Sequence, residues 1–398
     1  MIETSYNYRI PLYVFMATIS GFLISLFLFQ IFAVVLIVLW LLEKNKNKLL
    51  AFDKISLLFF IFIIIRILSS IFSAYPDSSL PMLYKDGIFF LSFYAMCFYL
   101  KVFSQRKIKT IAFTFVIAAI AVALIGLVKF NLGLVHRAES FSSGYMAYSL
   151  YLLASLGFGL LLYNFITQKK YAAAWTAGIG MIISGIAASL GRTNIVLAIL
   201  VFFVSLFFLK INKWFSLGIV LLSVIVVFVS FQLNTKELNT RFEQPAMMSD
   251  RDIIWGNAKE LILKFEHPLF GYGPRTFDKI FTGREKLQDV NVGSWHNDYI
   301  QLYLESGVLG LLSYLLLVGY SLFAAFKYLI RKKAKQFERV LLTGSIVSII
   351  ALLLAAVTSG FINSPLLPVV LVFFLALISA IVYPVEKITD KLIAEEIK

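Results

Sequence analysis

Residues 109–130 read KTIAFTFVIAAIAVALIGLVKF, and this stretch decides the fold class of the chain. An α-helix needs about 20 consecutive apolar residues to cross a bilayer, which is the length seen here. The stretch lacks the alternation of apolar and polar residues that marks a half-buried strand. Backbone groups in hydrocarbon must be hydrogen-bonded internally, and a helix does so within one segment. The stretch therefore predicts a transmembrane helix.

The composition of the chain extends this prediction to the whole sequence. The 398 residues are 60% hydrophobic and 15% charged, whereas soluble domains carry about 25% charged residues. A formal net charge of +14 would suggest a nucleic-acid partner for a soluble protein, but the lysines cluster between apolar runs. The lone Cys97 lies inside an apolar run, which argues against a disulfide or a cysteine-based metal site. We therefore predict an all-α polytopic protein whose partner is the lipid bilayer, with no nucleic acid.

Twelve segments are predicted as transmembrane helices. They are residues 10–26, 28–42, 54–73, 82–101, 109–130, 143–166, 171–189, 192–209, 214–232, 297–326, 338–357 and 364–384. Three regions follow from this pattern. Residues 1–232 hold the first nine helices, residues 233–295 form one long loop with short amphipathic helices, and residues 296–398 hold the last three helices and a tail.

The distribution of lysine and arginine predicts the orientation in the membrane. Alternate short loops are rich in basic residues, as in residues 101–109 and 327–339, whereas the loops between them are nearly free of lysine. Basic loops of membrane proteins remain in the cytoplasm. We therefore expect both termini in the cytoplasm and the loop 233–295 on the opposite, periplasmic face.

Several arginines then lie on the outer face, where the positive-inside bias disfavours them. They are Arg137, Arg192, Arg241, Arg251, Arg275 and Arg284. Arginines retained there suggest an anionic partner. The alternative is local pairing with acidic neighbours such as Glu139 or Asp250.

The long loop contains a predicted amphipathic helix and a predicted tight turn. Apolar residues from Ile253 to Ile262 recur at helical spacing, so this helix is expected to lie on the membrane surface. Arg251 and Trp255 are one turn apart and share a face. The glycines of Gly271-Tyr-Gly-Pro predict a turn that permits close backbone approach to a ligand. Asp250-x-Asp252 matches a metal-binding pattern of glycosyltransferases, but helix capping accounts for it, and we expect no metal.

His296 is the candidate catalytic residue. The sequence predicts that the tenth helix begins at Ser294 or Trp295, which places His296 in its first turn. The helix dipole disfavours an imidazolium there, so His296 is expected to be neutral and able to accept a proton. The alternative is an interfacial histidine that is hydrogen-bonded to Asn297 or Asp298.

Several charged residues, Lys129 among them, lie within predicted spans, and two of them are placed well inside the membrane. Arg66 is placed in the middle of the third helix and Glu305 inside the tenth. Charged side chains in a membrane are costly unless they are paired or face a polar cavity, which makes both residues functional candidates. Pairing of Glu305 with an outer arginine and orientation of a ligand by Glu305 both remain open from the sequence.

The order of these motifs resembles the O-antigen ligase and polymerase superfamily. The motifs are Arg137 with Gly144, Ser189-Leu-Gly-Arg192, Arg251-x-x-x-Trp255, Pro268-x-x-Gly271-x-Gly273, and His296-Asn297 with Glu305-x-Gly307-x-x-Gly310. The resemblance implies a GT-C-like glycosyltransferase bundle in the bacterial inner membrane. Such enzymes take a glycan from undecaprenyl diphosphate at the periplasmic face. Ligases pass it to the lipid A core in lipopolysaccharide biosynthesis, polymerases pass it to another glycan, and some relatives pass it to a protein hydroxyl.

The resemblance also implies roles for individual residues. Arg192, Arg251 and Arg137 correspond to diphosphate-binding arginines, and His296 corresponds to the general base. Possible supporting residues are Trp255, Asn297, Glu305 and Arg275. Guanidinium groups can take the place of a divalent metal at a diphosphate, so the implied reaction needs neither a metal nor a cofactor. A ligase is the favoured function. The alternatives are an O-antigen or exopolysaccharide polymerase, a protein O-oligosaccharyltransferase and, more distantly, a transporter of lipid-linked glycan.

Overall fold

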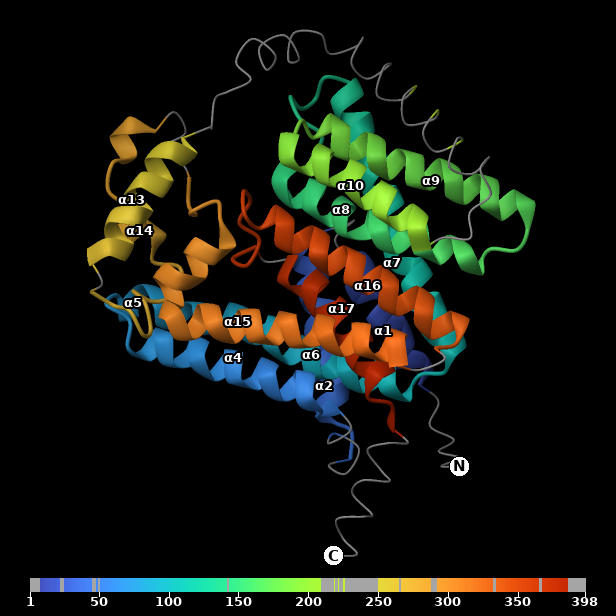
Figure 1. Ribbon diagram of the computed structural model, residues 1–398, viewed down its shortest axis with the longest axis horizontal. Helices are drawn as coiled ribbons and strands as arrows, with labels where there is room; N and C mark the ends of the chain where they lie inside the picture. Colours follow the sequence, from blue (N-terminus) through green and yellow to red (C-terminus); the bar gives the residue numbers. More distant parts are fainter. Residues whose placement is uncertain are drawn as a thin grey trace, which may run out of the picture.

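A computed structural model of the chain describes residues 8–21, 25–44, 48, 51–141, 143–208, 218, 221, 225, 250–264, 266–287, 292–331, 334–364 and 367–385. This described part is built of helices and turns and contains no strand (Figure 1). The α-helices are α1 (Arg9–Ser20), α2 (Leu26–Leu41), α4 (Lys54–Ile71), α5 (Pro76–Ser79), α6 (Leu83–Val102), α7 (Gln105–Asn131), α8 (Tyr145–Leu162), α9 (Lys169–Ala188), α10 (Arg192–Phe208), α13 (Arg251–Lys264), α14 (Phe277–Ile280), α15 (Asp298–Arg331), α16 (Gln336–Ala355) and α17 (Leu367–Val382). Short 3₁₀ helices are η3 (Leu80–Met82), η4 (Tyr163–Phe165) and η5 (Arg284–Lys286).

The helices confirm the predicted fold class. Those labelled α1, α2, α4, α6 to α10 and α15 to α17 overlap all the predicted spans except the ninth. The ninth, residues 214–232, lies almost entirely outside the described residues. Six helical segments in the described part are long and apolar enough to cross a membrane, and α1, α2, α10 and α17 are shorter apolar helices. The total of twelve spans and their orientation stay predictions.

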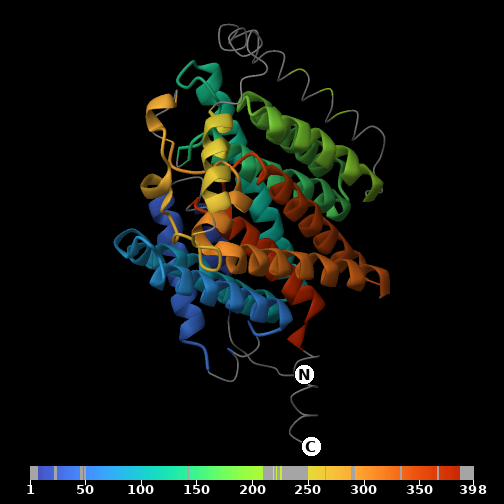
Figure 2. The same ribbon diagram turned by 60° about the vertical axis from the view of Figure 1, so that its left-hand side comes forward.

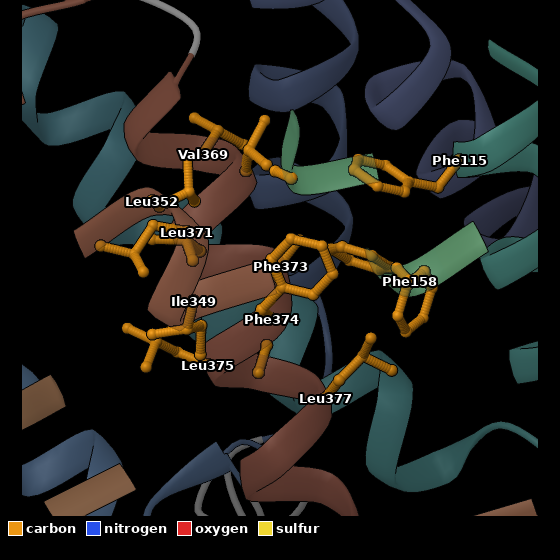
Figure 3. Packing of buried hydrophobic residues seen from close by; sticks show 14 of the residues in the cluster. Phe115, Phe158, Ile349, Leu352, Val369, Leu371, Phe373, Phe374, Leu375 and Leu377 are labelled. Atoms are coloured by element: carbon orange, nitrogen blue, oxygen red, sulfur yellow. The ribbon is translucent and has the colours of Figure 1, made fainter. Parts of the chain in front are cut away.

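Helix α17 forms the centre of the bundle. Every residue from Leu367 to Val382 is buried, and α17 packs on α6, α16 and α15. The ring of Phe373 lies 5.1 Å from that of Phe115 in α7, and the ring of Phe374 lies 5.3 Å from that of Phe158 in α8 (Figure 3). Aromatic pairs at this distance stabilise a core beyond their buried area. These contacts hold α17 against α7 and α8.

The described residues between 250 and 295, which we call the outer segment after their predicted location, pack as a small second core. Ile254 and Ala258 of α13 are buried together with Phe277 of α14 and Trp295. The ring of Trp295 is fully buried, 4.9 Å from that of Phe277. Figure 2 shows α13 (yellow) standing beside the first turns of α15 (orange). Part of the apolar stripe predicted for the membrane surface is therefore used to dock α13 on α14 and α15.

Candidate active site

His296 precedes α15. The sequence had placed it in the first turn of that helix. The helix begins at Asp298, and Asn297 caps it. The side-chain oxygen of Asn297 accepts hydrogen bonds from the backbone N–H groups of Tyr299 at 2.9 Å and Ile300 at 3.1 Å. Asparagine is among the strongest N-cap residues, and it moves the helix start past His296. The predicted helix position was wrong, and the dipole argument for a neutral imidazole loses its basis.

The side-chain oxygens of Asn297 and Asp298 both accept hydrogen bonds from backbone N–H groups. The carboxylate of Asp298 is fully buried and accepts hydrogen bonds from the N–H groups of Phe361 and Ile362 at 2.9 to 3.0 Å. This contact ties the loop between α16 and α17 to the start of α15. The residues flanking His296 therefore fix the local backbone.

Left-handed backbone conformations coincide with the predicted site residues. In the described part of the chain, the non-glycine residues with positive φ are Leu190, Asp250, Arg275 and His296, with φ between 51° and 61°. Leu190 and Asp250 belong to the turns that present Arg192 and Arg251. Conformations of this kind cost roughly 1–3 kcal/mol each and cluster at functional sites. The backbone thus marks the same positions as the motifs.

The segment that contains Arg137 holds the turn between α9 and α10. The guanidinium of Arg137 stacks over the ring of Tyr145, 3.3 Å from its centroid. Its Nε donates a hydrogen bond to the carbonyl of Ser189 at 2.8 Å. Since this turn leads directly into Arg192 at the start of α10, Arg137 also positions a second arginine.

Arg251 joins the other two arginines from a third segment. Burial lowers the pKa of Arg251, and the nearby positive charge of Arg192 lowers it further, while Tyr145 opposes the shift. Arginine keeps its charge even so. Within the described part, Nε of Arg251 is buried and has no hydrogen-bond partner. A buried donor without a hydrogen bond costs about 1–3 kcal/mol. An anionic ligand that accepts a hydrogen bond from this Nε would remove that cost. We refer to Arg137, Arg192 and Arg251 as the arginine cluster.

Trp255 connects the arginine cluster to the segment of His296. It lies one turn after Arg251 on α13, and its Nε1 donates a hydrogen bond to the carbonyl of Trp295 at 2.9 Å. The N–H of Trp295 in turn donates to the side-chain oxygen of Gln301 in α15 at 3.1 Å. Displacement of α13 would therefore move both Arg251 and the backbone next to His296.

Arg66 is buried in α4 and binds two carboxylates. Its Nη1 donates to Oε2 of Glu305 at 3.1 Å and to the hydroxyl of Ser306 at 3.0 Å. Its Nη2 donates to Oδ2 of Asp86 at 3.3 Å. The side-chain partner of Glu305 is therefore a buried arginine of α4 and not one of the arginines predicted for the outer face. Removing one partner from a buried ion pair costs about 3–5 kcal/mol.

Glu305 also fixes the outer segment. Its Oε1 accepts hydrogen bonds from the backbone N–H of Arg275 and from Nδ2 of Asn363, both at 2.8 Å. One carboxylate thus joins α4, α15, the segment after α13 and the loop before α17. Glu305 therefore fixes the positions of these four elements relative to one another, and its part in the reaction stays a prediction.

The glycine motif packs this segment onto α15. The N–H of Tyr272 donates to the carbonyl of Leu304 at 2.7 Å, and the N–H of Gly273 donates to that of Glu305 at 3.0 Å. Gly307 interrupts the helix at the same level, with φ 65°. A Cβ on Gly271 would lie 2.5 Å from the carbonyl oxygen of Leu304. The backbone of this turn, which was expected to approach a ligand closely, packs against α15 instead.

Gly271→Ala is expected to destabilise the protein and to lower its activity with it. At φ 69° an L side chain costs about 1–2 kcal/mol, and the clash with α15 adds to that cost. The matched control is Gly283→Ala, whose φ is 101° and whose added Cβ meets its nearest atom only at 3.9 Å. Thermal unfolding in detergent compares the two variants. Equal shifts in the unfolding temperature would show that docking on α15 contributes nothing.

The fold and site define a polytopic helical protein with a cationic cluster assembled from three segments and tied to a histidine. Residues 172–315, from α9 to α15, match the family model described as O-antigen ligase. The resemblance to the O-antigen ligase and polymerase superfamily is thereby confirmed over this part of the chain. Members of the family are glycosyltransferase-like enzymes of lipopolysaccharide and glycan biosynthesis. No curated protein sequence matches the chain.

Proposed function

We propose that the chain is an O-antigen ligase-type glycosyltransferase. It moves a glycan from undecaprenyl diphosphate to a hydroxyl of the lipid A core at the periplasmic face of the bacterial inner membrane. The observation that carries the proposal is the convergence of Arg137, Arg192 and Arg251, linked through Trp255 to the backbone beside His296. Guanidinium groups bind phosphate oxygens in pairs at any physiological pH, which suits a diphosphate leaving group.

The proposed reaction assigns one task to each group. The acceptor oxygen forms a bond to the anomeric carbon of the glycan while the bond from that carbon to the diphosphate oxygen breaks. The diphosphate leaves with the electron pair, and the arginine cluster stabilises its charge. His296 takes the proton of the acceptor hydroxyl, an effect typically worth about 10²–10⁴-fold in rate.

The other members of the superfamily would share this donor site. A polymerase or a protein O-oligosaccharyltransferase differs in the acceptor, and the arginine cluster does not read the acceptor. A transporter of lipid-linked glycan needs no base. The ligase is favoured because the sequence predicts one extended loop, between the ninth and tenth helices.

Incubation of the purified protein with labelled undecaprenyl-diphosphate glycan and lipid A core tests the proposal. We expect covalent transfer of the label to the acceptor. The rate should be the same in EDTA, because guanidinium groups neutralise the diphosphate without a metal ion. Movement of the label across a vesicle membrane without bond change would identify a transporter instead. Loss of transfer in EDTA that Mg²⁺ or Mn²⁺ restores would assign a metal to Asp250 and Asp252.

A further inference from the structure

A polar cavity of about 410 Å³ lies beside the segment that carries His296. Its lining includes Ser294 and Asp298, which stand on either side of His296 in the chain. The volume falls in the range of about 300–1,000 Å³ that ligand sites occupy. Most of the other lining side chains donate or accept hydrogen bonds, whereas Phe277 is almost fully buried against Phe281 and Trp295. Hydrogen-bonding groups of this number suit the hydroxyls of a saccharide.

The polar side chains of this cavity are held in place by the fold. Gln301 and Asn363 both donate to Glu305, and the carboxylate of Asp298 is held by backbone N–H groups. Groups fixed in this way lose little freedom when a ligand binds. The cavity is therefore preformed.

A second cavity of about 200 Å³ adjoins the first, and Arg275 and Ser364 line both. Its walls are largely apolar side chains of α2, α6 and α17, including Phe29, Phe89 and Val369. Lys85 and Asp86 add charge to the same cavity. The two cavities together offer a polar compartment and an apolar compartment with a charged boundary.

Arg275 occupies the boundary between the compartments. Its backbone is fixed by the carboxylate of Glu305, and its Nη2 lies 3.6 Å from Oδ1 of Asp86. Among the described residues, Nε of Arg275 is buried without a hydrogen-bond partner. A long contact to one carboxylate and an unused donor leave this guanidinium able to bind an anionic oxygen.

We propose that the two cavities bind the glycan acceptor as a lipid-anchored saccharide with an anionic substituent. The hydroxyls of the saccharide meet the polar side chains of the first cavity, its phosphate or carboxylate meets Arg275, and an acyl chain enters the apolar cavity. The assignment to the acceptor rests on the proposed function, since the arginine cluster holds the donor. The polar cavity is lined by the η3 region, α14, α15 and the loop before α17, and the apolar cavity by α2, α6 and α17. Neither lining includes a residue of the arginine cluster. Donor and acceptor would thus approach His296 from different elements.

Steady-state kinetics of Arg275→Gln test the anionic contact. We expect the KM for the acceptor to rise roughly ten- to hundredfold, the usual loss for a hydrogen bond to a charged group, with the donor KM unchanged. Arg106→Gln is the control, because Arg106 is exposed at the start of α7 and lines neither cavity. The anion is identified by comparing three acceptors, which carry a phosphate, a carboxylate only, or neither group. The effect of Arg275→Gln on the acceptor KM disappears when the anion that Arg275 binds is absent.

A second variant tests occupancy of the polar cavity. Gly293 lines the cavity, and a Cβ there meets no atom within 4 Å, so Gly293→Leu is expected to fold and to raise the acceptor KM. Gly319→Leu in α15 makes the same change in equally open space away from both cavities. Removing the acyl chains from the acceptor is expected to raise its KM for the wild-type protein as well.

The outcomes separate this inference from the proposed function. Transfer by the wild-type protein with unchanged acceptor KM in Arg275→Gln and Gly293→Leu would overturn the acceptor site and leave the transferase intact. A rise confined to the donor KM would assign the cavity to the donor and also overturn it. If the wild-type protein transfers no glycan, direct binding of the anchored acceptor to wild type and to Gly293→Leu decides the site by itself.

Discussion

Replacement of His296 by asparagine is expected to lower the turnover of glycan transfer by about 10²–10⁴-fold, the usual contribution of a general base. Asparagine is the informative substitute because His296 has φ 51°, a conformation in which asparagine and histidine are both enriched. Alanine would remove the imidazole and strain the backbone at once. The measurement is turnover of purified protein on lipid-linked donor, with thermal unfolding to confirm that the variant folds.

The pH dependence separates a base from a structural histidine. A general base must be deprotonated, so wild-type turnover should rise with pH as an imidazole loses its proton. The asparagine variant should lose that rise, and added imidazole should restore part of the rate. His267→Asn is the control, because His267 is exposed on the same outer segment and packs edge-on against Tyr272. Wild-type turnover of His296→Asn would remove His296 from the mechanism.

The helices could be predicted because their signal is local. Residues 109–130 were expected to form a helix and α7 spans Gln105–Asn131, since length and hydropathy are properties of one segment. The predicted start of α15 was wrong because two nearby residues, Ser294 and Asn297, can each cap a helix. The sequence cannot show which of Ser294 and Asn297 caps the helix, and the contacts of Trp295 with Phe277 and Gln301 favour the later start.

The candidate site residues could be predicted only through the resemblance, because the motifs that carry them are far apart in the chain. The motif order pointed to Arg192, Arg251 and His296, and the structure brings Arg192 and Arg251 together beside Tyr145. The partner of Arg66 was not predictable. Glu305 is 239 residues away in the chain, and only the packing of α4 on α15 sets their register. The position of Arg275 between two cavities depends on the same packing.

Replacement of Arg251 by lysine is expected to reduce turnover by about 10²–10³-fold, as the loss of one preorganised transition-state donor does. Lysine keeps the charge but presents a point charge in place of a planar fork. The effect should be large here because Arg251 is partly buried, approaches Arg192 and has an Nε that no described residue binds. Arg192→Lys should behave similarly, and Arg137→Lys should also disturb the turn that Arg137 fixes through Ser189.

The matched control for these variants is Arg284→Lys. Arg284 belongs to the same outer segment and pairs with Asp278 at an exposed position, where the exchange should leave turnover within about twofold of wild type, as expected for an exposed pair. Inhibition by undecaprenyl diphosphate gives a second readout, since weaker inhibition of Arg251→Lys places the lost contact on the diphosphate. Wild-type turnover with unchanged inhibition would instead make Arg251 a structural residue of α13, because a guanidinium that binds the leaving group cannot be exchanged for an ammonium at no cost.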